Sequence, residues 1–215
     1  MKLKNIVKVV SLISLFIMGS CQMSNDQVTD PEEVAAEDLP DVPAFEDDFT
    51  RGFLTSINET KEGYYPFLSG TKKYEMDFPE DGVIHERTYA VDNKNAEGFF
   101  IILKGKDSNY EIDIEYYSFK SPNRLDHTME NIKKNIEKEL DFEEIDTDPQ
   151  IETYIASYEY PDGEFGYVVI AQHEHSGAIQ LTYKVECDES DKDCNLQKVK
   201  KIVESWASSI NFIND

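Results

Sequence analysis

The 215-residue sequence has little positive charge: 21 lysines and arginines stand against 44 aspartates and glutamates, for a formal net charge of −23 at pH 7. Such a chain repels the phosphates of nucleic acids and the headgroups of anionic lipids. We therefore expect neither nucleic acid nor an anionic membrane surface among its partners. Hydrophobic residues still make up 40% of the chain, with 12 tyrosines and 12 phenylalanines, which argues for a packed core rather than disorder.

The sequence also lacks the short motifs that mark common active sites. It has no Gly-x-Ser-x-Gly elbow, no His-Glu-x-x-His zinc motif and no phosphate-binding glycine loop. Each of these motifs places a nucleophile, a metal or a phosphate at a fixed backbone geometry, so their absence leaves no catalytic residue to nominate. We expect a protein that is not an enzyme and uses no cofactor, with an enzyme of unrecognised type as a further alternative.

Long apolar runs are missing except at the N-terminus. Lys2, Lys4 and Lys8 are followed by the uncharged segment 9–18. This order of a basic region and a short apolar region is typical of a secretory signal, and the run is too short to cross a bilayer core of about 30 Å as a helix. The sequence therefore predicts a signal peptide rather than a transmembrane helix.

The signal ends in Met18-Gly19-Ser20-Cys21, where two small residues directly precede a cysteine. This stretch resembles the lipobox of bacterial lipoproteins, in which the cysteine is lipidated, for instance with palmitate, and becomes the first mature residue. The resemblance implies a signal peptide over residues 1–20 and an anchor at Cys21, held at about 0.8 kcal/mol per buried methylene. The protein would then be extracytoplasmic and attached to a bacterial membrane, either the cell membrane or an outer membrane.

Residues 21–43 carry acidic side chains and several prolines but no basic residue. Such a segment repels itself and resists helix formation, so we predict a flexible tether between the anchor and the domain. From residue 44 the pattern changes, because Phe45, Phe49 and Ile57 recur at helical spacing. We predict an amphipathic helix of about three turns over residues 44–57.

The middle of the chain alternates polar and apolar residues with the period of a β-strand. Segments 73–78 and 110–116 alternate in this way, 83–91 follows a turn as a return strand, and 98–103 is a short apolar run consistent with a central strand. Short polar loops join these four segments, which predicts an antiparallel meander. A long helix follows from the predicted N-cap Ser121 to Leu140, because apolar residues recur every three or four positions.

A second β block covers segments 151–160, 165–175 and 178–185. Ser176-Gly177 predicts a two-residue hairpin turn that would place His175 opposite Ala178 and His173 opposite Gln180. Asn195 is expected to cap a last helix. The whole pattern predicts a single α+β domain over residues 44–215, with an antiparallel sheet of about six to seven strands covered by helices.

One combination of features resembles a known fold. A strand and turn of the form Tyr-x-x-x-Phe-Pro-x-x-Gly, at Tyr74 to Gly82, precedes several strands, a long helix, more strands and a closing helix with Trp206. This order resembles the PsbP-like α/β/α sandwich of photosynthetic extrinsic proteins and many bacterial lipoproteins. The resemblance implies a role in binding or assembly and carries over no catalytic residue.

Cysteine is scarce, with three in the chain. Lipidation of Cys21 would leave Cys187 and Cys194, which lie in a polar loop. An even pair outside the cytoplasm favours a disulfide over a metal or redox site. The sequence therefore predicts a Cys187–Cys194 bond.

Metal binding is the alternative function. His173 and His175 share one face of a predicted strand, a geometry that can chelate zinc or copper, although two surface histidines beside a turn are the commoner case. Asp191, Asp193 and Asn195 have the spacing that begins a calcium loop, but Leu196 replaces the glycine that such a loop requires. The leading prediction is a non-catalytic binding or assembly role in the cell envelope, with a protein partner of unspecified identity. Tyrosine pairs such as Tyr64-Tyr65 could line a groove, although core packing is more common.

Overall fold

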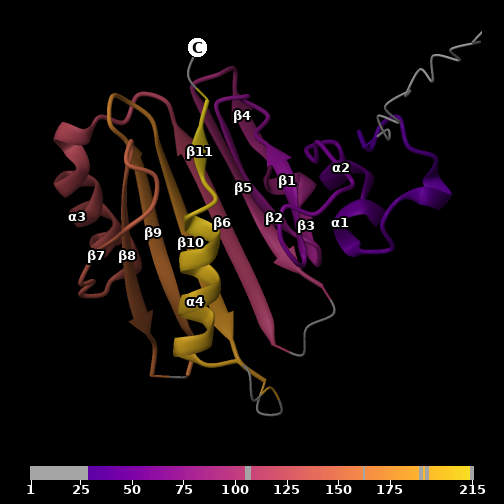
Figure 1. The fold of residues 1–215 in the computed structure, drawn as a ribbon. Coiled ribbons are helices and arrows are strands. Elements are labelled where there is room, and N and C mark those ends of the chain that lie inside the picture. The colour runs from indigo at the N-terminus through magenta and orange to yellow at the C-terminus, as the bar shows by residue number, and fades with distance from the viewer. Residues whose placement is uncertain (1–28, 105–107, 162, 189–190, 192–193, 214–215) are drawn as a thin grey trace, which may run out of the picture.

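The computed structural model describes residues 29–104, 108–161, 163–188, 191 and 194–213 (Figure 1). An eight-stranded antiparallel sheet forms the centre, and a three-stranded sheet lies over one of its faces together with helix α4. Helix α3 packs against the other face. The predicted α+β class is confirmed, whereas the strands form two sheets instead of the one expected sheet of about six to seven strands. The predicted signal peptide and Cys21 lie outside the described residues.

The N-terminal helices are shorter than predicted. A 3-10 turn, η1 (Ala36–Asp38), precedes α1 (Pro43–Glu46) and α2 (Asp48–Arg51). The predicted three-turn helix is wrong because Asp47 takes an extended conformation and its side chain accepts the Thr50 N–H at 2.8 Å. An aspartate that caps a second helix ends the first one.

Part of the predicted tether contacts the folded domain. Leu39 and Val42 pack against the main core, and the Ile57 N–H donates to the Thr29 carbonyl at 2.7 Å. The acidic segment therefore meets the fold before residue 44, the first residue of the predicted domain.

The small sheet has the order β1-β2-β11 and comprises β1 (Tyr64–Leu68), β2 (Tyr74–Pro79) and β11 (Asn211–Phe212). The predicted pairing of β2 with the strand that follows it is wrong. Strand β2 instead pairs with β1 and with the C-terminal β11. The turn after Pro79 carries the chain across to the other sheet.

The large sheet has the order β3-β5-β6-β10-β9-β8-β7, with β4 also paired to β5. Turn η2 (Glu86–Thr88) divides the expected strand over residues 83–91 into β3 and β4. The strands are β3 (Gly82–Ile84), β4 (Ala90–Asp92), β5 (Ala96–Leu103), β6 (Asn109–Tyr117), β7 (Glu143–Ile145), β8 (Ile151–Glu159), β9 (Phe165–His173) and β10 (Ala178–Glu186).

The β9–β10 hairpin differs in register from the prediction. His173 donates its N–H to the Gly177 carbonyl at 3.0 Å, so the loop consists of residues 174–176 and Gly177 takes a φ of +97°. A shift by an odd number of residues reverses the faces of a strand. Val168 and Ile170 therefore pack under α3, although the predicted register placed them on the face of Ile179, Leu181 and Tyr183.

The two long helices cover opposite faces of the large sheet. Turn η3 (Pro122–Arg124) precedes α3 (Leu125–Ile136), which is shorter than the predicted helix. Ser121 occupies the predicted N-cap position, but of η3, and its side chain makes no capping hydrogen bond. The cap of α4 (Leu196–Ala207) is confirmed, since the Asn195 side chain accepts the Lys198 N–H at 3.1 Å.

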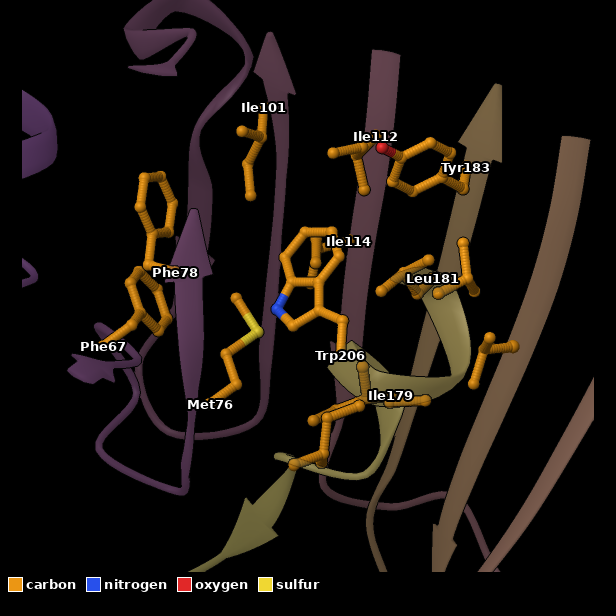
Figure 2. Close-up of a cluster of buried hydrophobic side chains, with 14 of the residues drawn as sticks. Phe67, Met76, Phe78, Ile101, Ile112, Ile114, Ile179, Leu181, Tyr183 and Trp206 are labelled. Carbon is orange, nitrogen blue, oxygen red and sulfur yellow. The ribbon is translucent and has the colours of Figure 1, made fainter. Parts of the chain in front are cut away.

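The main core lies between the two sheets and α4. Figure 2 shows Trp206 of α4 between Met76 of β2 and the central strands β6 and β10. Trp206 is 1% exposed, and Ile114 and Leu181 are equally buried. No helix in the part of the chain that the structure describes is both long enough and apolar enough to cross a membrane.

Candidate functional site: an aromatic cavity between the sheets

A cavity of about 460 Å³ lies where the turn between β2 and β3, the facing ends of β5 and β6, strand β10 and helix α4 come together. Its lining combines aromatic rings, aliphatic side chains and carboxylates. The described residues that line it are Gly63, Tyr64, Pro79, Glu80, Asp81, Leu103, Tyr110, Ile112, Tyr183, Asp191, Val199, Ile202 and Trp206.

Four aromatic side chains line the cavity. Strand β10 alternates Ile179, Leu181 and Tyr183 toward the core, which brings Tyr183 beneath α4. The Tyr183 ring meets Trp206 edge to face at a centroid distance of 6.4 Å and meets Tyr110 at 6.1 Å. Edge-to-face packing keeps each ring in a fixed orientation.

The Tyr183 hydroxyl is a buried polar group in this lining. The residue is 2% exposed and lines the cavity. Figure 2 shows the hydroxyl directed toward Ile112, which lines the same cavity. Burial, followed by the charges of Tyr64, Tyr110 and Asp81, raises the pKa of Tyr183, so the group stays a neutral phenol that can both donate and accept.

The carboxylates of Glu80 and Asp81 come from the tight turn after β2. Gly82 is needed in this turn because a Cβ atom there would lie 2.9 Å from the Phe78 ring and 3.0 Å from the Pro79 carbonyl. Burial raises the pKa of Tyr64, and the negative charges of Asp81 and Asp77 raise it further. The turn therefore presents negative charge beside an aromatic ring.

The disulfide loop supplies the third carboxylate. Cys187 and Cys194 are bonded, which confirms the predicted pair. Ser108, at the start of β6, donates its hydroxyl to Asp191 at 2.8 Å, and the Cys194 N–H donates to the other Asp191 oxygen at 3.1 Å. The Asp188 N–H donates back to the Ser108 hydroxyl at 3.1 Å. This network holds Asp191 at the cavity, and sequence analysis missed Ser108 because nothing local marks it.

Lys61, which precedes β1, lies next to the cavity. The Lys61 ammonium is 4.4 Å from the centroid of the Tyr64 ring and 3.0 Å from an Asp77 carboxylate oxygen. It also bonds to the Ser205 carbonyl and hydroxyl at 3.1 and 3.0 Å, which fixes β1 against α4. Lys61 is held by these groups and is not part of the cavity lining.

The two candidate metal ligands occupy different environments. His173 is 5% exposed and packs on Phe212 of β11 at a centroid distance of 5.4 Å, whereas His175 is exposed in the hairpin loop. The prediction that both rings are solvent-accessible is therefore wrong for His173, because the register is shifted. Within the described ranges, no group of three histidines, cysteines or acids is placed to hold a metal ion. Asp193 of the acidic loop lies outside those ranges.

Two further carboxylates, Glu97 and Asp113, have raised pKa values, and neither lines the cavity. Glu97 is buried on β5 and accepts the N–H groups of Gly70 and Thr71 at 2.9 and 3.2 Å. Burial raises its pKa, while these hydrogen bonds act in the opposite direction. Asp113 lies on the other face of the large sheet, where burial and then the charges of Glu115 and Glu111 raise its pKa to about 6.

The comparison with protein families matches residues 40–211 to the family described as "Putative lipoprotein YvcA". The chain belongs to this family. A relative of the same description from Bacillus subtilis (strain 168) is 29% identical over 238 residues, covering 99% of this chain and 98% of its own length. No solved structure shows a significant match. The family match includes the whole cavity lining, from Gly63 to Trp206.

Proposed function

We propose that the protein is a lipid-anchored, extracytoplasmic binding protein of the bacterial cell envelope. The family match supports a lipoprotein, and Met18-Gly19-Ser20-Cys21 supplies the site at which lipid would be attached. Residues 1–20 would be removed and Cys21 would carry the acyl chains. The domain would then act at the outer surface of a membrane.

The cavity between the sheets is the observation that carries the binding role. Its volume of about 460 Å³ falls within the range of small-ligand sites, and it combines apolar walls with a few polar groups. The described lining contains no histidine, lysine, cysteine or serine that could serve as a nucleophile or a base partner. Apolar walls with a few polar groups are the usual composition of a site that binds a small ligand.

The chain contains one tryptophan, Trp206, and this residue lines the cavity. Fluorescence excited near 295 nm therefore reports on the proposed site alone. We would titrate the full chain, purified in detergent, with n-butylammonium, 1-butanol and butyrate, which are too short to load the micelles heavily. The proposal expects a saturable change in Trp206 fluorescence with at least one of these probes.

A matched pair of variants locates the response. Ile202→Phe enlarges a side chain that is 42% exposed and lines the cavity, so it should weaken the response several-fold. Gln197→Phe places the same ring at an exposed position of α4 outside the lining and should leave the response unchanged. The binding role would be contradicted if no probe gave a saturable response, or if both variants behaved alike.

A further inference from the structure

We propose that the cavity recognises an organic cation, meaning an ammonium or guanidinium group carried on a short apolar body. This inference rests on the proposed function, because it assigns a ligand class to the same cavity. It is carried by the aromatic rings, the hydrogen-bond acceptors and the sign of the charges in the described lining.

The rings provide the first argument. Tyr64, Tyr110, Tyr183 and Trp206 all line the cavity, and aromatic faces attract cations through their negative π-electron density. The protein already uses this chemistry beside the cavity, where the Lys61 ammonium contacts the Tyr64 ring at 4.4 Å and pairs with Asp77 at 3.0 Å. An ammonium between an aromatic ring and a carboxylate is therefore an arrangement that this end of the fold accommodates.

The polar groups provide the second argument. The carboxylates of Glu80, Asp81 and Asp191 and the Tyr183 hydroxyl can all accept hydrogen bonds from a cation. Tyr183 is 2% exposed and lines the cavity, and its neutral hydroxyl can accept a hydrogen bond from an ammonium or guanidinium group. Asp81 and Asp191 also make contacts within the protein, so the argument does not require them to be unpaired.

The absence of basic groups provides the third argument. Among the described lining residues none is lysine, arginine or histidine, and the Trp206 N–H is already donated to the Asp77 carbonyl. An anion entering the cavity would meet several carboxylates and few donors, which is unfavourable in a partly buried site. Ile112, Val199 and Ile202 offer apolar surface to the body that carries the charge.

The charge preference follows from the three-probe titration. n-Butylammonium should bind at least about tenfold more tightly than 1-butanol, and butyrate should be weaker than either, since charge is the main difference among the three. Equal or tighter binding of 1-butanol or butyrate would overturn the cation assignment while leaving the binding role intact. A lack of response to all three would instead contradict the binding role itself.

Variants test whether the cavity groups cause the preference. Tyr183→Phe removes only the hydroxyl and keeps the packed ring, so the fold should be retained, with an unchanged circular dichroism spectrum, and the affinity for n-butylammonium should fall about three- to tenfold. Glu80→Gln should weaken the binding of n-butylammonium by a similar factor without changing the affinity for 1-butanol. Glu152→Gln makes the same charge change at an exposed position of β8 outside the lining and should have no effect. Equal losses in Glu80→Gln and Glu152→Gln would overturn the assignment, because the effect would then reflect only net charge.

The cation could be a free amine or a side chain of a protein partner, and competition separates the two sources. We would test acetyl-Leu-Lys-Leu-amide beside the neutral acetyl-Leu-norleucine-Leu-amide, whose side chain lacks the ammonium. Displacement of n-butylammonium by the lysine peptide alone supports a side-chain source, and displacement by neither peptide supports a free amine. Equal displacement by both peptides would show that the charge is not read, and would overturn the inference.

Discussion

The indole N–H of Trp206 on α4 donates a hydrogen bond to the backbone carbonyl of Asp77 on β2. The Asp77 N–H in turn donates to the Ser209 hydroxyl at 3.0 Å. Strand β11 pairs only with Tyr74 and Glu75 of β2. The side chains of Trp206 and Ser209 therefore supply the hydrogen bonds of the β2 edge at Asp77, beyond the point where β11 ends. A helix and a turn thus continue a sheet edge through their side chains.

Trp206→Phe should therefore destabilise the protein by about 2–3 kcal/mol. The substitution leaves the Asp77 carbonyl without its donor in a partly buried setting and removes part of a packed ring system. Urea unfolding followed by circular dichroism measures the change. Phe119→Leu alters an aromatic residue that is 69% exposed and should change stability by less than about 0.5 kcal/mol. Comparable effects of the two substitutions would contradict the structural role of the Trp206 bond.

Removal of the disulfide should lower the free energy of unfolding by about 2–3 kcal/mol, the loop-closure value for a short loop. The test compares Cys187→Ser/Cys194→Ser with the unmodified chain, each with and without a reducing agent. Reduction should destabilise only the chain that has the bond. A double variant that still responded to the reducing agent would show that the loss comes from elsewhere.

Loss of the disulfide should also disturb the cavity, because the loop holds Asp191 against Ser108. The fluorescence response of Trp206 to n-butylammonium is expected to weaken in the double variant at a temperature where the fold persists. Ser108→Ala breaks the same contact without touching the disulfide and should reproduce the weaker response. A normal response in Ser108→Ala would show that the contact between Ser108 and Asp191 does not affect ligand binding.

The stability of the protein should depend on Asp113 between about pH 4 and 6. Burial raises the pKa of this carboxyl from 3.8 to about 6, so the folded state holds its proton more tightly than the unfolded state does. Stability from this group is therefore complete below pH 3.8 and is lost as the pH rises toward 6. Asp113→Asn should stabilise by about 1 kcal/mol at pH 7.5, after allowance for solvent screening, and by nothing at pH 3.5. A gain of equal size at both pH values would point to packing instead of ionisation.

Cys21→Ala should release the protein from the membrane fraction, because lipid is the proposed anchor. Cells fed labelled palmitate should incorporate the label into the unmodified chain and not into the variant. Cys187→Ser, which removes a different cysteine, should retain both the label and the membrane association. Membrane-bound Cys21→Ala would rule out the lipid anchor.

Local patterns were sufficient for the kinds of element but not for their pairing. The alternation of polar and apolar residues predicts β2. The sequence of β1 contains Pro66 and does not alternate between polar and apolar residues, so it does not reveal the strand that pairs with β2. Strand β11 has two residues, too few to form any pattern. The meander was therefore assigned to neighbours in sequence, although β2 finds both partners elsewhere.

The hairpin register shows a limit of turn signals. Ser176-Gly177 predicted a two-residue turn, but the Gly177 carbonyl accepts from His173 and the loop has three residues. Both faces of β9 are buried, so hydrophobicity could not reveal the error. The cavity was also out of reach, since Tyr64, Tyr183 and Trp206 are far apart in the sequence and meet only in the folded chain.

The bond between Trp206 and Asp77 joins residues that are 129 positions apart, and β11 follows Trp206 in the chain. Any fragment that ends before α4 therefore lacks the groups that bond to the β2 edge opposite β1. The pairing of β1 with β2 lies within residues 64–79, whereas the third strand of the small sheet requires residues 211 and 212. The three-stranded sheet thus joins segments from the two ends of the described chain, and a substitution near residue 211 would disturb the same edge as one at Asp77.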